Sequence, residues 1–134
     1  MIRKEYNKMK LHHIAITVNN LKQSIDFYTS ILGFSIVKQF ERKDLNGKAA
    51  FIELNDCKLE LWEFKDMKEN KDSLVDLKIR GIRHIAFEVD NLSKTIIQLK
   101  AKGIECSKPK LGASGHNYSF ITDPNGIALE LYEK

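Results

Sequence analysis

Two histidines and two glutamates recur in this sequence within a pair of matched patterns. His13 is the second residue of HHIAITVNNLKQSI, and His84 is the second residue of RHIAFEVDNLSKTI, 71 positions later. Glu60 lies in LELWE, and Glu130 lies 70 positions later in LELYE. Imidazole nitrogens and carboxylate oxygens bind borderline divalent cations, and carboxylates also act as general bases. The repeated residues therefore predict a metal centre capable of acid–base chemistry.

The recurrence of these residues favours a metal centre over the alternative that they are ordinary surface residues. A single histidine at a strand start, or a single outward glutamate, is usually a surface residue, and a single motif match has a high false-positive rate. Here two different local patterns recur in the same order at nearly the same spacing. A duplicated structural unit explains this economically. We therefore predict one divalent ion bound by His13, Glu60, His84 and Glu130.

The elements that position these residues follow the same plan in both units: strand, helix, then three strands. In the first unit a helix begins after Asn19 or Asn20 and ends at Gly33, and in the second it begins after Asp90 or Asn91 and ends at Gly103. The predicted strands are near residues 12–18, 34–43, 48–54 and 58–64, and then 83–89, 104–108, 117–122 and 127–133.

Strand alternation predicts where the four side chains point. Neighbouring residues of a strand face opposite sides of the sheet, and the helix covers the side that carries Ile, Leu and Val. Leu59 and Leu61 then face the helix, whereas Glu60 faces away, and the second unit repeats this. Pairing of the two units about a pseudo-twofold axis would bring the four ligands together. The same alternation places His12 on the opposite face and excludes it as a ligand.

Composition narrows the class of protein. The 134 residues carry a net charge of +4, from 22 Lys and Arg against 18 Asp and Glu, without a basic block, which argues against nucleic-acid binding. The N-terminal MIRKEYNKMK lacks the apolar core of a signal peptide, and no segment is long and apolar enough for a membrane span. We expect a cytoplasmic protein without membrane contact, in which Cys57 and Cys106 are reduced thiols.

The domain organisation follows from the repeat. We expect one domain over residues 11–134. Its parts are a first module at about 11–64, a polar linker at about 65–80 and a second module at about 81–134, preceded by an extension at 1–10.

The stretches HHIAITVNNLKQSIDFYTSILGF, GIRHIAFEVDNL and DPNGIALELYE resemble the vicinal oxygen chelate superfamily, also called the glyoxalase, bleomycin-resistance and dioxygenase superfamily. The resemblance extends from Leu11 to Glu133. It implies an α+β fold in which two βαβββ modules form an eight-stranded, cup-shaped mixed sheet around one metal ion, often in a homodimer. The four predicted ligands occupy the superfamily's ligand positions. Ni²⁺, Zn²⁺, Co²⁺ and Mn²⁺ suit this donor set, and Fe²⁺ suits it less well.

The resemblance also implies an activity. Superfamily enzymes chelate a small-molecule substrate through neighbouring oxygens and stabilise an enediolate or a similar oxyanion. The leading expectation is a glyoxalase I-like lyase or isomerase acting on a small α-oxygenated carbonyl compound or its thiol adduct. By this analogy Glu130 is the catalytic base and Glu60 its counterpart. Glutathione-using members carry Arg and Asn where this chain has Thr17 and Phe64, which argues against glutathione.

Four other activities occur on related modules. Methylmalonyl-CoA epimerases share features of the loop LGASGHNYSF but tend to have Gln in place of Glu60. Ring-cleaving dioxygenases use two His and one Glu, and thiol transferases usually continue further beyond the last ligand. Bleomycin-binding members lack the metal ligands and sequester their drug without catalysis. The intact ligand set disfavours this last class.

Four further residues are predicted to contact a substrate, and each has a plainer alternative. Trp62, Phe64 and Tyr132 alternate with the leucines and either line a cavity or pack at a dimer interface. His116, in the GASGHN loop, either contacts an anionic substrate or is solvated.

Overall fold

The computed structural model describes residues 8–71 and 76–134. The first unit contains β1 (Ile14–Thr17), α1 (Leu21–Ser30), β2 (Ser35–Arg42), the 3₁₀ turn η1 (Lys43–Leu45), β3 (Gly47–Leu54) and β4 (Cys57–Phe64). The second unit contains β5 (Ile85–Val89), α2 (Leu92–Ala101), β6 (Lys110–Leu111), β7 (Asn117–Thr122) and β8 (Ala128–Glu133). The predicted α+β class and the βαβββ order of each unit are confirmed.

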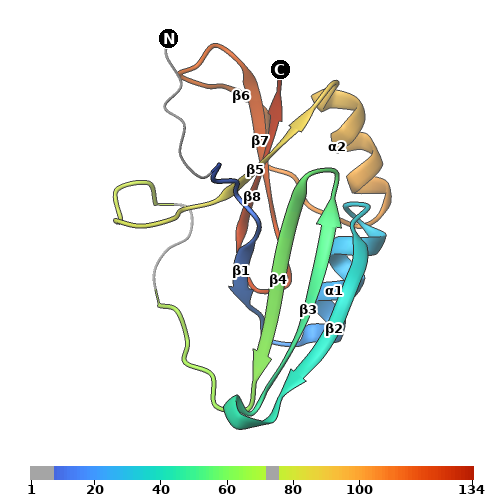
Figure 1. Ribbon diagram of the computed structural model, residues 1–134. Helices are drawn as coiled ribbons and strands as arrows, with labels where there is room; N and C mark the ends of the chain where they lie inside the picture. The colour runs from blue at the N-terminus through green and yellow to red at the C-terminus, as the bar shows by residue number, and fades with distance from the viewer. Residues whose placement is uncertain (1–7, 72–75) are drawn as a thin grey trace.

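The described strands form two four-stranded mixed sheets, ordered β1-β4-β3-β2 and β5-β8-β7-β6. In each sheet the first strand runs parallel to the last strand of its unit, and the other pairings are antiparallel. Figure 1 shows α1 lying behind the first sheet and α2 lying beside the second. Each sheet therefore has one helix-covered face and one face without a helix, as strand alternation predicts.

Both helices are joined to the strand that carries the predicted ligand glutamate. Asn20 and Asn91 cap the two helices, each accepting a hydrogen bond from a backbone N–H in the first turn, at 2.9 and 3.0 Å. The first helical N–H donates to Glu63 at the end of β4 in one unit, and to Glu133 at the end of β8 in the other, both at 2.7 Å. These carboxylates face the positive ends of the helix dipoles. Each helix start is thus held at a defined position on its sheet.

The helix-covered faces of the two sheets share one hydrophobic core. Leu59 and Leu61 on β4 are fully buried, as is Leu129 on β8, and Leu131 is 2% exposed. These leucines alternate with Glu60 and Glu130, whose side chains must then face the other way. Neither described helix is long and apolar enough to span a bilayer.

The strand predicted near residues 104–108 is wrong. The structure places only a two-residue strand, β6, at Lys110–Leu111. At Ser107 the chain still contacts β7, through its N–H to Phe120 O at 2.8 Å and through the Ser119 hydroxyl, which donates to Ser107 O at 2.6 Å. The Ser107 carbonyl therefore accepts its hydrogen bond from a side-chain hydroxyl and not from a backbone N–H, as it would in a regular β-sheet. Pro109 follows without an N–H donor, so the strand begins only after it.

Parts of two predicted segments lie outside the described residues. These are residues 1–7 of the expected N-terminal extension and residues 72–75 of the expected linker. The described parts of the linker contain no helix or strand, as its polar composition indicates.

The turn after β7 connects the second unit to the helix of the first. Asp123 accepts a hydrogen bond from the Tyr28 hydroxyl at 2.8 Å, and Asn125 donates to Ser24 Oγ at 3.1 Å. Tyr28 and Ser24 are fully buried, and Asp123 is 5% exposed. Burial, followed by the charge of Asp123 and its hydrogen bond, raises the pKa of the Tyr28 phenol. The turn therefore fixes how the two units sit together.

Tyr28→Phe is expected to lower the free energy of unfolding by about 1.5–3 kcal/mol, because it removes a buried hydrogen bond to a charged group. Since the folded pKa of Tyr28 is raised, its contribution is fully present below the unfolded pKa, near 10, and is lost as the pH rises further. Urea titrations at pH 7 and above pH 10 measure both effects. Tyr118→Phe is the control, because the Tyr118 hydroxyl makes no hydrogen bond within the described residues. Equal stability of the two variants at pH 7 would contradict the prediction.

Candidate metal centre

The structure pairs the four predicted ligands two by two. His13 Nε2 lies 3.8 Å from Glu60 Oε1, and His84 Nε2 lies 3.9 Å from Glu130 Oε2. The parallel strand pairs create both contacts: Ala15 on β1 is level with Glu60, and Ala86 on β5 is level with Glu130. The glutamate side chains are 15% and 17% exposed. The same geometry is thus built twice.

A phenylalanine lies behind each pair. Phe51 is the antiparallel partner of Glu60, and its ring packs edge-on against His13 with the centroids 5.1 Å apart. Phe120 is the partner of Glu130 and packs against the His84 ring at 5.2 Å. These aromatic contacts limit the rotation of both imidazoles and hold their Nε2 atoms near the carboxylates.

Each pair fits a transition-metal ion, but the two pairs lie apart. The separations of 3.8 and 3.9 Å are below the combined length of two metal–ligand bonds, about 4.2 Å, so one ion can contact both atoms of a pair. Within residues 8–71 and 76–134 no three His, Cys, Asp or Glu side chains lie close enough to hold an ion together. We call the His13–Glu60 pair the first half-site and the His84–Glu130 pair the second half-site.

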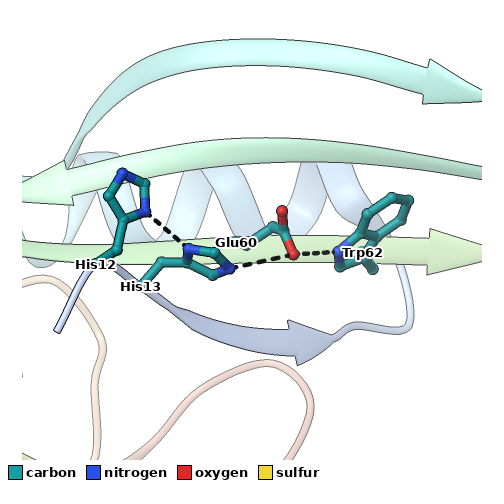
Figure 2. A network of polar contacts seen from close by, with 4 residues as sticks. All are labelled: His12, His13, Glu60 and Trp62. Atoms are coloured by element: carbon teal, nitrogen blue, oxygen red, sulfur yellow. Dashed lines mark hydrogen bonds and ion pairs between the residues drawn. The ribbon is translucent and has the colours of Figure 1, made fainter. Parts of the chain in front are cut away.

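His12 does not lie where strand alternation places it. Its Nδ1 lies 2.8 Å from His13 Nδ1 (Figure 2), and both rings pack edge-on against Phe51. The prediction of an opposite face is wrong because β1 begins only at Ile14, so residue 12 precedes the alternating part of the chain. A hydrogen bond between the two Nδ1 atoms leaves His13 Nε2 directed at Glu60.

Two of the aromatic residues predicted to contact substrate, Trp62 and Phe64, lie with Phe40 on the first sheet. Trp62 and Phe64 stack in parallel, with centroids 5.2 Å apart and planes inclined by 5°, and Phe40 meets Trp62 edge-on at 5.5 Å. All three are half-buried. The Trp62 indole N–H also donates to Glu60 Oε1 at 2.6 Å (Figure 2). This apolar surface therefore reaches the first half-site.

The corresponding region of the second unit, near the end of β8, carries more polar side chains. The Tyr132 hydroxyl lies 3.0 Å from Ser114 Oγ, and its ring lies 5.2 Å from that of His116. His116 is half-buried, with Nδ1 3.0 Å from the carbonyl oxygen of Glu133. The structure thus places His116 and Tyr132 side by side at the end of β8.

Comparison with known proteins identifies the family of this chain. Residues 10–131 match the sequence profile of the Glyoxalase/Bleomycin resistance protein/Dioxygenase superfamily. The chain belongs to this superfamily. Among curated relatives, the Uncharacterized protein YwkD of Bacillus subtilis is 32% identical over 126 residues, covering 92% of this chain and 96% of the relative. The mitochondrial methylmalonyl-CoA epimerase of Dictyostelium discoideum is 31% identical over 130 residues, covering 93% and 78%.

Solved structures of the superfamily share the fold. The glyoxalase family protein from Enterococcus faecalis aligns with a TM-score of 0.81 at 28% identity, covering 92% of this chain and 97% of that protein. This similarity confirms the predicted α+β glyoxalase fold.

Two features of the site are absent from the sequence-based predictions: the aromatic support of the histidines and the hydrogen bond from Trp62 to Glu60. The two histidines are supported by Phe51 and Phe120. The dipeptide Phe-Ile occurs at residues 51–52 of the first unit and again 69 positions later in the second unit. A third matched pattern was therefore present. The hydrogen bond from Trp62 to Glu60 had no such signal, because the second unit carries Tyr132 at the matching position.

Proposed function

We propose that this chain is a metal-dependent lyase or isomerase of the glyoxalase superfamily. It would move a proton on the carbon next to a carbonyl group of a small α-oxygenated compound or its thiol adduct. The observation that supports this is the duplicated His–Glu pair, set by the same strand register and backed by the same aromatic contact in both units. Structural ion pairs alone give no reason for such repetition.

His13, Glu60, His84 and Glu130 are the residues that would hold one divalent ion, for which Ni²⁺, Zn²⁺, Co²⁺ and Mn²⁺ are the suitable candidates. When bound, the ion supplies positive charge that stabilises negative charge developing on substrate oxygens. Carboxylate and imidazole donors that are already paired, with both carboxylates largely shielded from solvent, fit this role.

A complete four-ligand site requires two copies of the chain. The two half-sites of one copy lie apart, so we propose that the first half-site of one copy combines with the second half-site of another. A twofold-symmetric homodimer then contains two equivalent sites. The helix-free sheet faces, which carry both half-sites and the half-buried aromatic residues, would enclose the substrate.

Glu130 is the better candidate for the catalytic base. Glu60 is held by the Trp62 indole, whereas the carboxylate of Glu130 contacts only His84 among the described residues. A carboxylate without a fixed donor can swing toward the substrate. In the proposed step Glu130 takes the proton from the carbon beside the carbonyl and returns it to the neighbouring carbon. Return to the opposite face of the same carbon would instead be an epimerisation.

The aromatic surface restricts the substrate. Phe64 stacks on Trp62, and a Cβ added at Gly47 would lie 2.6 Å from the Phe64 ring, so this surface is closely packed. It offers apolar contact where a charged tripeptide needs polar anchors. We therefore propose an adduct of a thiol other than glutathione, or a free hydroxycarbonyl compound. Methylmalonyl-CoA epimerisation is the second candidate, supported by the 31% identical epimerase.

A substrate panel tests this proposal. Protein loaded separately with each of the four metals is offered hemithioacetals of several thiols, methylmalonyl-CoA and catechols in D₂O. We expect metal-dependent turnover of a hemithioacetal or an epimerisation, with deuterium entering the carbon beside the carbonyl. Oxygen consumption with catechol alone would support a dioxygenase instead. Tight bleomycin binding by metal-free protein, without any turnover, would support a sequestering protein.

A further inference from the structure

The indole of Trp62 makes the shortest polar contact at the first half-site. Trp62 follows Glu60 by two residues on β4, so both side chains leave the same face of the sheet. The indole N–H donates to Glu60 Oε1 at 2.6 Å, and the same oxygen lies 3.8 Å from His13 Nε2 (Figure 2). The donor therefore acts on the oxygen that faces the histidine.

The surroundings of Trp62 prevent its ring from turning away. Phe64 stacks on one face at 5.2 Å, and Phe40 packs edge-on at 5.5 Å. A Cβ at Gly47 would lie 3.5 Å from the indole, which shows that the β3 backbone is close as well. A ring packed from several directions loses little further freedom when its N–H binds a carboxylate.

The second half-site lacks this arrangement. Tyr132 occupies the position that matches Trp62, but its hydroxyl contacts Ser114 Oγ at 3.0 Å instead of Glu130. The two half-sites therefore differ in the polar partner of the glutamate: Glu60 accepts a hydrogen bond from the aromatic residue two positions later, whereas the hydroxyl of the matching Tyr132 contacts Ser114.

We propose that Trp62 is a positioning residue that fixes Glu60 as the immobile carboxylate ligand. This inference rests on the proposed metal-dependent function and deepens it, because it assigns different roles to the two glutamates. A hydrogen-bonded partner orients a metal ligand before the ion arrives, and loss of such a partner typically weakens metal affinity about 10–100-fold.

The test is a Zn²⁺ titration in competition with a fluorescent chelator. Trp62→Phe keeps an aromatic ring in the stack and removes only the N–H, and we expect about 10–100-fold weaker Zn²⁺ binding. Tyr118→Phe is the matched control: it also removes one polar hydrogen from an aromatic side chain but leaves the indole N–H and Glu60 in place, so it should bind Zn²⁺ like the unmodified protein. In a Glu60→Ala background, Trp62→Phe should cause no further loss, because its effect passes through Glu60.

Intrinsic fluorescence provides a second readout that needs no substituted tryptophan. Trp62 is the only tryptophan of the chain, so all tryptophan emission comes from this site. In metal-free protein Glu60→Ala should shift that emission, since the indole N–H loses its carboxylate partner. Tyr118→Phe, which changes neither the indole nor Glu60, is the comparison and should leave the tryptophan emission unchanged.

Different failures point to different errors. Equal Zn²⁺ affinity of Trp62→Phe and the unmodified protein would overturn the positioning role alone. So would a further loss in the Glu60→Ala background, or unchanged emission on Glu60→Ala. Absence of Zn²⁺ binding by the unmodified dimer would overturn the proposed metal-dependent function, and the positioning role with it.

Discussion

Replacement of Glu130 by glutamine is expected to reduce turnover by about 10²–10⁴-fold, the usual contribution of a general base. The amide retains the size and the oxygen donor of the side chain, so the remaining three ligands and the amide should still hold the metal. Within the described residues the only polar contact of the Glu130 carboxylate is the 3.9 Å contact with His84 Nε2, so its substitution breaks no hydrogen bond there. Turnover is measured on the substrate found in the panel, and metal content by elemental analysis of the same samples.

The control for this substitution is Glu88→Gln, which removes one carboxylate from β5, close to the second half-site. The Glu88 side chain is 60% exposed, and within residues 8–71 and 76–134 its only polar contact is the 4.0 Å one with Lys134, so activity should not change. Full activity of Glu130→Gln with metal bound would show that Glu130 is not the base. A matching loss in Glu60→Gln alone would transfer that role to Glu60.

Mixing two inactive variants is expected to restore function. One variant carries His13→Ala and Glu60→Ala, and the other carries His84→Ala and Glu130→Ala. If each site combines half-sites from two copies, a mixed dimer contains one intact site and one site that lacks all four ligands. After unfolding and refolding of an equal mixture, about half of the dimers are mixed and about a quarter of all sites are intact.

Bound Zn²⁺ per chain measures this restoration without knowledge of the substrate. We expect about a quarter of the unmodified protein's content in the mixture and almost none in either variant alone. Each variant refolded by itself is the control for the procedure. No recovery in the mixture, although light scattering shows dimers, would mean that the site forms within one chain or not at all.

The strands of the two units could be predicted well because their signals are local. Buried leucines alternate with Glu60 and Glu130 in β4 and β8, and the period of two carries over directly into the structure. The predictions of a strand near residues 104–108 and of an opposite orientation for His12 failed, because these residues do not follow regular backbone pairing. Ser119 bonds Ser107 through its side chain, and His12 precedes the first residue of β1.

The positions of the four candidate ligands on helix-free faces follow from the sequence alone, since duplication and strand alternation depend on neighbouring residues. The relation between the two half-sites was decided by tertiary structure. It depends on contacts between residues far apart, such as Tyr28 with Asp123, whose geometry no local pattern encodes. The same holds for the indole of Trp62, which donates to Glu60 while Phe40 and Phe64 pack against its ring. Residue type and spacing thus specified the candidate ligands of each half-site, and long-range packing specified how the half-sites are arranged and which glutamate accepts a hydrogen bond.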